Sequence, residues 1–282
     1  MFGSEFKKLR LKNHISLRTA AKNVTSPTSL SRWENDEGDM DYGKVIELLH
    51  NIHISPSEFV FITAVTPHDP FIRQIEIAWK NDSSFELKEL TIQNLDNYNS
   101  THKDTYLFNA AMAANYYYDL TDKNILPTKY KELLEEKLSS VTFWSKRNIY
   151  IFGNSLSLLS TSTIYGLACL IIDDIENIKK TGFENYLDML LGLLNAFQEL
   201  VLFDTKRADL FLLKFDTIPL NRYSLYIKIK KNFLKALLLY KKTNNSSYPE
   251  DYIRTMRQYD LNDIADIFES AFKTLQTIKS KA

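Results

Sequence analysis

The residues of this sequence best suited to do chemistry are short polar side chains and one arginine within residues 26–35. Thr28, Ser29 and Ser31 carry hydroxyl groups, and Arg32 carries a planar guanidinium. In the major groove of DNA, an arginine can donate two hydrogen bonds to one guanine, while hydroxyls reach base edges, thymine methyls or phosphates. This combination is typical of a helix that reads a DNA sequence.

Two short helices would have to hold these side chains outward. Ser16 predicts the N-cap of a helix that ends near Asn23, and Ser26-Pro27 predicts the start of a second helix that ends near Glu34. We expect the small and apolar side chains of the pair to be buried between the helices: Ala20, Ala21, Val24, Leu30 and Trp33. In the turn between the two helices, Thr25 occupies the position where we expect a residue with positive φ.

Three further patterns complete a five-helix domain. One helix begins near Phe2, Asp41 begins a fourth, and Ser55-Pro56 begins a fifth. Short helices joined by tight turns over residues 1–62 outline a helix-turn-helix domain. Residues 66–70 then hold two prolines, which remove backbone donors and disfavour helix before them. We therefore predict a first domain at 1–65, a linker at 66–70 and a second domain at 71–282.

The second domain is predicted to be helical to its end. The chain has only 7 Gly and 7 Pro among 282 residues, too few for an all-β protein with frequent turns. Apolar residues at helical spacing predict helices over 70–81, 84–98, 103–120, 128–139, 144–160, 161–179, 183–203, 206–216, 221–242, 249–258 and 261–279. The predicted fold is all-α: a five-helix lambda-repressor-like helix-turn-helix domain followed by a TPR-like α-solenoid, although no clean repeat of ~34 residues is present.

The net charge of zero conceals a division within the first domain. Residues 1–33 carry seven Lys and Arg against one acid, a net +6, and residues 34–62 carry one Lys against seven acids, a net −6. The basic half suits the phosphates of double-stranded DNA. We expect phosphate contacts from helix N-termini and from Lys7, Ser16, Ser26, Ser31 and Lys44, and base contacts from Arg18, Thr28, Ser29 and Arg32. The alternative is a helical pair that only packs.

The run from Ser26 to Asn35, with its Ser-Arg-Trp-Glu-Asn ending, resembles the helix-turn-helix of the phage-repressor-like (Cro/C1, XRE) class. The turn between Ala21 and Ser26 is one residue shorter than usual and lacks a glycine. This turn and the all-helical remainder are similar to the Rgg/GadR/MutR family of Gram-positive transcriptional regulators. Residues 144–154 resemble that family's W-x-x-x-E-x-x-x-F-x-N region, with Asn148 in place of the acidic residue.

The resemblance implies a cytoplasmic, homodimeric, quorum-sensing transcriptional regulator. Its helical repeat would mediate dimerisation and bind a short linear pheromone peptide in a concave groove. It also implies that Glu34 pairs within the protein. Some members form an intersubunit disulfide through a cysteine in the fourth helix, but Tyr42 and Gly43 occupy that neighbourhood here, so no such bond is expected.

Candidate peptide-binding residues are amides, one arginine and tyrosines of the second domain. Asn109, Asn154, Asn195 and Asn232 lie inside apolar helical runs, where an amide needs partners and could hold a peptide backbone or bond to a neighbouring helix. Arg147 could receive a carboxylate or be solvated. Tyr165 and Tyr223 could line a ligand pocket or belong to the core. The stretch 205–242, with a net +8, could attract an acidic peptide or be a solvated helix face.

The remaining residues give no sign of an enzyme, a metal site or a cofactor. His50 and His53 have no third ligand nearby, and no nucleophile elbow, Walker motif or carboxylate pair is present. Cys169 is alone, which suits a reducing cytosol, and is expected in the core. No apolar stretch approaches a membrane span. Two competing functions remain: a ligand-independent repressor whose helical repeat is only a dimerisation or interaction scaffold, and an enzyme with a DNA-binding head.

Overall fold

The structure is a computed structural model that describes residues 2–63 and 70–281, and within these ranges it contains helices and turns but no strand. The chain divides into two compact units, Met1–Arg73 and Gln74–Ala282. The division falls inside α6 (Pro70–Lys80), whose first residue is the second proline of the predicted linker. The rest of that linker, 66–69, lies outside the described residues.

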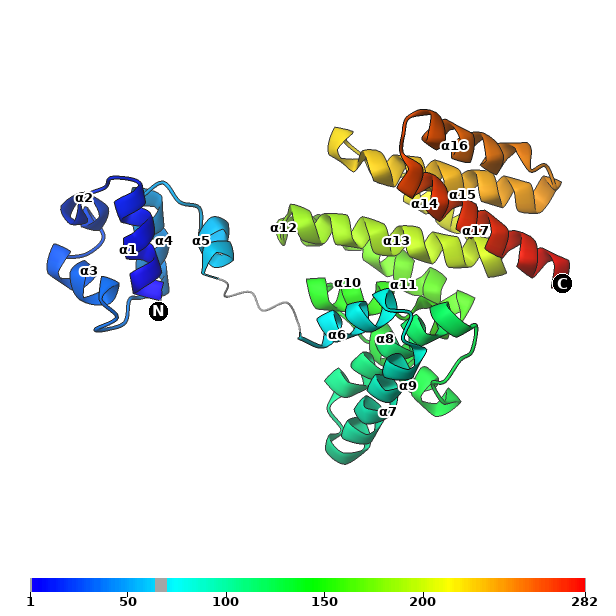
Figure 1. Cartoon of the computed structure of the whole chain (residues 1–282), viewed down its shortest axis with the longest axis horizontal. Helices are drawn as coiled ribbons and strands as arrows, with labels where there is room; N and C mark the ends of the chain where they lie inside the picture. The colour runs from blue at the N-terminus through cyan, green and yellow to red at the C-terminus, as the bar shows by residue number, and fades with distance from the viewer. Residues whose placement is uncertain (1, 64–69, 282) are drawn as a thin grey trace. The chain divides into compact units, whose positions relative to one another are not determined.

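The first unit consists of five short helices (Figure 1). They are α1 (Phe2–Lys12), α2 (Leu17–Ala21), α3 (Pro27–Glu34), α4 (Tyr42–Asn51) and α5 (Pro56–Ile62). The predicted caps are confirmed, because the side chains of Ser16, Ser26, Asp41 and Ser55 each accept a hydrogen bond from a backbone N–H in the first turn that follows. Phe6, Leu30, Trp33 and Leu48 are buried in a common core.

The turn between α2 and α3 places its strained residue differently from the prediction. Asn23, not Thr25, adopts the left-handed conformation, with φ of +64°. Asparagine tolerates this region better than a β-branched residue does, so the turn closes without a glycine. Val24, expected to be buried, is half-buried against the core.

Gly3 sets how closely α1 can approach α3. A Cβ added to Gly3 would lie 1.8 Å from the carbonyl oxygen of Trp33, so alanine would force the two helices apart. We expect Gly3→Ala to destabilise the first unit by about 1–3 kcal/mol. Urea denaturation of the full chain tests this, with Gly38→Ala as the matched control, since a Cβ there would meet nothing within 4 Å. Equal stability of the two variants would contradict the prediction.

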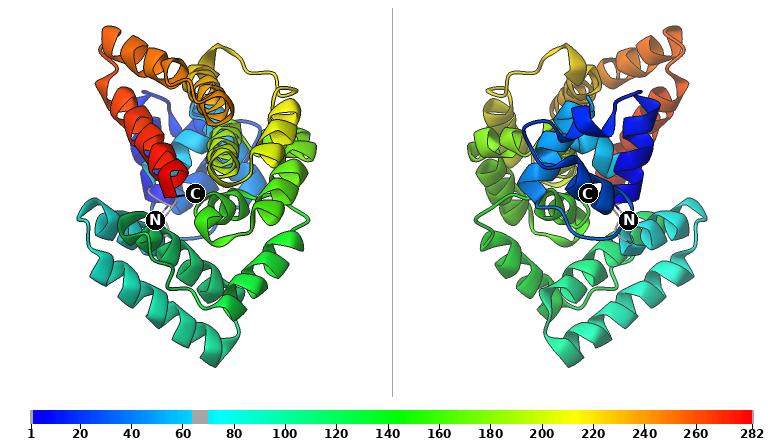
Figure 2. Two further views of the ribbon diagram at one scale, coloured as in Figure 1. Left: turned by 90° about the vertical axis from the view of Figure 1, so that its right-hand side faces the viewer. Right: turned by 90° about the vertical axis from the view of Figure 1, so that its left-hand side faces the viewer.

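The second unit is a succession of helices that follow one another around an arc, from α7 and α8 at one end to α16 and α17 at the other (Figure 2). After α6 come α7 (Ser84–Thr101), α8 (Asp104–Thr121), α9 (Thr128–Ser139), α10 (Lys146–Gly153), η1 (Leu156–Leu158), α11 (Thr161–Asp173), α12 (Ile175–Lys180), α13 (Phe183–Phe203), α14 (Thr205–Phe215), η2 (Arg222–Ser224), α15 (Leu225–Thr243), α16 (Ser247–Gln258) and α17 (Asn262–Lys281).

Two predicted helices are interrupted. The helix expected over 144–160 ends at Gly153, because the side chain of Asn154 donates to the carbonyl of Tyr150 and the chain continues as a single 3₁₀ turn. The helix expected over 161–179 breaks at Asp174, whose carboxylate accepts a hydrogen bond from the side chain of Asn177, 2.7 Å away. Local polar side chains compete here with the helical ladder.

Helix α13 is the centre of the second unit and contacts α10, α11, α12, α14 and α15. Gly153 of α10 and Gly192 of α13 face each other, and a Cβ added to Gly153 would lie only 3.5 Å from the Gly192 Cα, so the absence of side chains lets the two helices approach closely. Among the described residues, α13 alone is long and apolar enough to cross a membrane. Most of that apolar window is buried inside the unit, as expected for the core helix of a globular domain.

Candidate DNA and peptide interfaces

The outer face of α3 presents the predicted DNA-reading side chains to solvent. Thr28, Ser29 and Arg32 are exposed, and Ser31 is half-buried. Ser26 and Ser29 share a hydroxyl–hydroxyl hydrogen bond of 2.9 Å at the start of the helix. The predicted base-contacting residues of α3 therefore lie on an open surface, as DNA recognition requires.

A buried ion pair fixes α3 against α1. Arg10 Nε lies 2.6 Å from Glu34 Oε1, and Arg10 Nη2 lies 2.7 Å from Glu34 Oε2. The third guanidinium nitrogen donates to the carbonyl of Ile15, just before α2. Hydrogen bonding to Glu34 raises the pKa of Arg10, against the effect of burial. Glu34 pairs within the protein as expected, and Arg10 is not part of the basic surface inferred from charge.

The other predicted phosphate contacts are distributed around the first unit. Ser16 and Arg18 lie at the start of α2 and are both exposed. Lys44 is exposed in the first turn of α4. Lys7 lies on α1, and its amine donates to the side chain of Asn35, at the C-terminal end of α3, over 2.7 Å. The two capping hydroxyls, those of Ser16 and Ser26, are already used as acceptors within their helices.

Asn154 is the predicted peptide-binding residue with the most internal partners. Its Oδ1 accepts a hydrogen bond of 2.9 Å from the Tyr116 hydroxyl, and its Nδ2 donates to Tyr150 over 2.8 Å. Asn154 therefore ties α8 to the end of α10. Arg147, in the first turn of α10, is exposed.

Asn195 and Asn232, which lie inside apolar helical runs of the sequence, are on the surface of the second unit. Both are exposed, because they lie on the faces of α13 and α15 that the neighbouring helices do not cover. Asn195 accepts a 2.9 Å hydrogen bond from Lys230, which joins these two helices. Asn109 is buried as expected, and its Oδ1 has no hydrogen-bond partner among the described residues.

The two predicted tyrosines lie on different elements. Tyr165 is half-buried on α11, and its pKa is raised, chiefly by a hydrogen bond with Cys169. Cys169 is itself half-buried, which corrects its assignment to the core. Tyr223 is 66% exposed on η2, and its hydroxyl accepts from Arg222 over 2.8 Å. Of the seven candidate peptide-binding residues, Asn154, Asn195, Tyr165 and Tyr223 each bond to residues outside this set.

Sequence reasoning missed three charged residues of the second unit, Asp119, Glu199 and Lys230. Glu199 lies one turn after Asn195 on α13, Lys230 bonds to Asn195 from α15, and Asp119 lies in the last turn of α8. Burial and the nearby Asp119 raise the pKa of Glu199 to about 7. Burial lowers the pKa of Lys230 to about 8. The only feature of the sequence that could have indicated these residues was the carboxylate of Glu199 within a long apolar helix.

Glu199 and Lys230 are only partly exposed, and the protein around each reduces its contact with water. Lys230 bonds to Asn195, and Glu199 lies one turn further along the same face of α13, so these three side chains form one polar cluster. We refer to Asp119, Asn195, Glu199 and Lys230 as the α13 recess.

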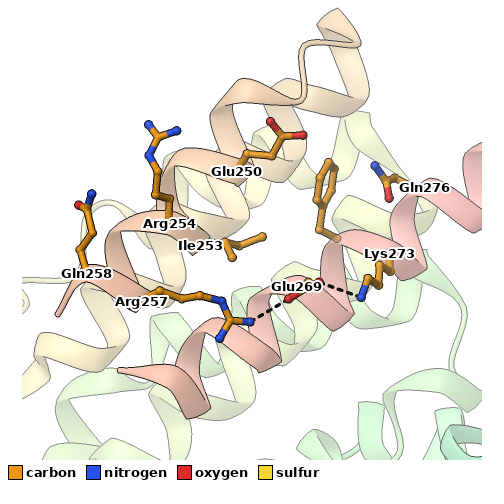
Figure 3. A pocket seen from close by; sticks show the side chains of 9 residues that line it. Glu250, Ile253, Arg254, Arg257, Gln258, Glu269, Lys273 and Gln276 are labelled. Carbon is orange, nitrogen blue, oxygen red and sulfur yellow. Dashed lines mark hydrogen bonds and ion pairs between the residues drawn. The ribbon is translucent and has the colours of Figure 1, made fainter. Parts of the chain in front are cut away.

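A separate hollow of about 720 Å³ lies between α16 and α17 (Figure 3). Its charged side chains are largely neutralised by one another or by neighbours. Arg257 pairs with Asp266 and Glu269, Lys273 pairs with Glu269, and Arg254 pairs with Asp251. No predicted site residue lines this hollow.

The described residues contain no group of three or more histidine, cysteine, aspartate or glutamate side chains that could hold a metal ion. A shallow hollow of about 670 Å³ beside α2 and α4 includes His50 and His53, without a set of ligands around them. The geometry thus presents a polar helix face in the first unit and a charged recess in the second.

Comparison with known proteins identifies the family of the chain and other proteins with the same fold. Residues 88–270, more than half of the chain, match the family described as "HTH-type transcriptional regulator Rgg, C-terminal domain". No curated protein sequence matches the chain.

Several solved structures have the same fold over nearly the whole chain. The SHP pheromone receptor Rgg2 of Streptococcus dysgalactiae is 14% identical, covers 97% of this chain and 99% of its own, and has a TM-score of 0.76. A protein from Listeria monocytogenes EGD-e is 16% identical, with coverage of 99% and 98% and a TM-score of 0.77. PrgX in its cCF10 complex is 15% identical, with coverage of 99% and 92% and a TM-score of 0.68.

Proposed function

The chain belongs to the Rgg family of HTH-type transcriptional regulators, and from that premise we propose that it binds promoter DNA through its first unit and a short linear peptide through its second. The observation that carries the proposal is the exposed face of α3, where Thr28, Ser29 and Arg32 point away from a core locked by the Arg10–Glu34 pair. A polar helix face held by a rigid scaffold is what major-groove recognition needs.

Peptide binding rests on the relatives and on the second unit. Rgg2 is a pheromone receptor, and another structure with this fold is a bacterial peptide pheromone/receptor complex. The α13 recess offers charged and amide groups on adjacent helices, which suits a ligand with polar groups along a backbone. We assign the 71–282 region the roles of peptide binding and dimerisation, and the 1–65 region that of DNA binding.

We further propose that the protein acts as a homodimer in the cytoplasm and is not an enzyme. Two copies would place two α3 helices on two half-sites of an operator. A peptide that binds one arrangement of the dimer better would shift the population toward it and change the fit to the operator. Cys169 is a free thiol, which is compatible with a reducing compartment.

Replacing Arg32 by alanine tests the DNA-binding proposal. The operator is first selected from random duplexes with the full chain, and affinities are then measured by fluorescence anisotropy. If Arg32 contacts a guanine, the variant loses about 1–3 kcal/mol on the selected operator and much less on random DNA. Arg254→Ala, on an exposed helix of the second unit, is the matched control and should leave both affinities unchanged. An equal loss on both DNAs would make Arg32 a phosphate contact, and no loss on either would contradict its role.

A further inference from the structure

The α13 recess contains a carboxylate that no described residue neutralises. Glu199 forms no hydrogen bond or ion pair with any part of the chain that the structure describes. The charged residue that contributes to its raised pKa is another acid, Asp119. Asp119 accepts a 2.7 Å hydrogen bond from the indole nitrogen of Trp79. Both acids lie near helix C-termini, where the helix dipole also disfavours negative charge.

The same recess contains a cation that no described acid neutralises. Lys230 donates a hydrogen bond of 2.9 Å to the neutral side-chain oxygen of Asn195. Burial alone accounts for the lowered pKa of Lys230, and no carboxylate contributes. The other lysines of α15 contrast with it: Lys231 and Lys235 pair with Asp216, and Lys242 pairs with Asp209.

Glu199 and Lys230 do not neutralise each other, although Asn195 lies between them. Asn195 is bonded to Lys230 and stands four residues before Glu199, on the same face of α13. Leaving two opposite charges partly desolvated and unpaired costs free energy in the unliganded protein. A ligand that brings a complementary charge to each group removes that cost when it binds.

We propose that the α13 recess binds a peptide that carries one positive and one negative group, with the positive group on Glu199 and Asp119 and the negative group on Lys230. This inference rests on the proposed peptide-binding function and specifies the ligand's charge. Charge-assisted hydrogen bonds of a carboxylate with Lys230, and of an ammonium or guanidinium with Glu199, fix the direction of the peptide across α13 and α15. The positive group can be the free N-terminus or a Lys or Arg side chain, and the negative group the C-terminus or an Asp or Glu side chain.

The test uses the full chain and synthetic octapeptide pools made of Ala, Val, Leu, Ile and Phe. One pool has both termini free, one is acetylated, one is amidated, and one has both termini blocked. A fifth pool has blocked termini and one Lys and one Asp at random positions. Retention after ultrafiltration is measured by mass spectrometry for the unmodified protein, Glu199→Gln and Lys230→Met, with Glu132→Gln and Lys228→Met as matched controls. Circular dichroism establishes that each variant is folded.

We expect the unmodified protein and both controls to retain peptides with two charged groups about 10-fold better than the neutral pool. Glu199→Gln should lose the preference for a positive group only, and Lys230→Met the preference for a negative group only. Retention of the fifth pool assigns the charges to side chains, and its absence assigns them to the termini. Retention without charge preference, or preferences unchanged in both variants, would overturn this inference alone. If the unmodified protein retains no pool, peptide binding itself is contradicted, and the inference with it.

Discussion

Glu34→Gln is expected to destabilise the first unit by about 3–5 kcal/mol, because it removes one partner of a buried ion pair and leaves the other charged. Arg10 is 6% exposed and Glu34 2% exposed, so water cannot replace the lost carboxylate. Glutamine offers one acceptor oxygen where the guanidinium now donates to two. The loss is a large share of the total stability of a small domain.

Hydrogen exchange of the full chain, read by mass spectrometry, measures this effect in residues 2–62 separately from the second unit. Protection of α1 and α3 should fall sharply in Glu34→Gln, while that of α13 stays unchanged. The double variant Arg10→Met with Glu34→Leu is the control, since an apolar pair of similar volume is often as stable as the ion pair. Unchanged protection in the single variant would show that the pair contributes little.

The ion pair also has a consequence for DNA binding. Arg10 of α1 holds Glu34 at the end of α3 and the Ile15 carbonyl before α2, so one side chain connects three segments of the motif. Loss of the pair therefore loosens the helix that carries Thr28, Ser29 and Arg32. We expect Glu34→Gln to weaken operator binding without any direct contact to DNA, because the recognition face must then be ordered on binding.

The helix starts of the first unit could be predicted because their causes are local. Ser16, Ser26, Asp41 and Ser55 each cap the turn that directly follows, so a few neighbouring residues suffice to recognise them. The Arg10–Glu34 pair joins positions 24 apart, and no composition or spacing rule reveals it. The family resemblance implied the intramolecular role of Glu34, whereas its partner came only from the structure.

The orientation of the candidate peptide-binding residues on α13 could not be predicted in this way, because α13 is apolar on most of its surface. Its sequence does not indicate which face the neighbouring helices leave uncovered, so it left open whether Asn195 faces a groove or a neighbouring helix. In the structure Asn195 is exposed and bonds to Lys230 of α15. Glu199 reads in sequence as an ordinary polar position on a helix. Its raised pKa arises from burial and from Asp119, which lies 80 residues earlier on α8. Packing between distant helices, rather than helical periodicity, determines the recess.

Glu199→Gln is expected to stabilise the second unit at pH 8, in contrast to most substitutions of partly buried residues. In the folded protein the pKa of Glu199 is about 7, raised from an ordinary value of 4.5 by burial and by Asp119. The folded state therefore binds this proton more tightly than the unfolded state does. Stability falls as the pH rises from 4.5 to 7 and stays reduced above it, by at most about 3 kcal/mol. Glutamine carries no proton to lose and avoids this cost.

Urea denaturation of the full chain at pH 4.5 and pH 8 measures the difference between the variant and the unmodified protein. The difference should be small at pH 4.5 and favour Glu199→Gln at pH 8, whereas Glu132→Gln, on an exposed position of α9, should show no such change. A pH-independent difference would contradict the assignment. A positively charged ligand group beside Glu199 would remove the same cost. Such a ligand should therefore stabilise the unmodified protein at pH 8 more than it stabilises Glu199→Gln.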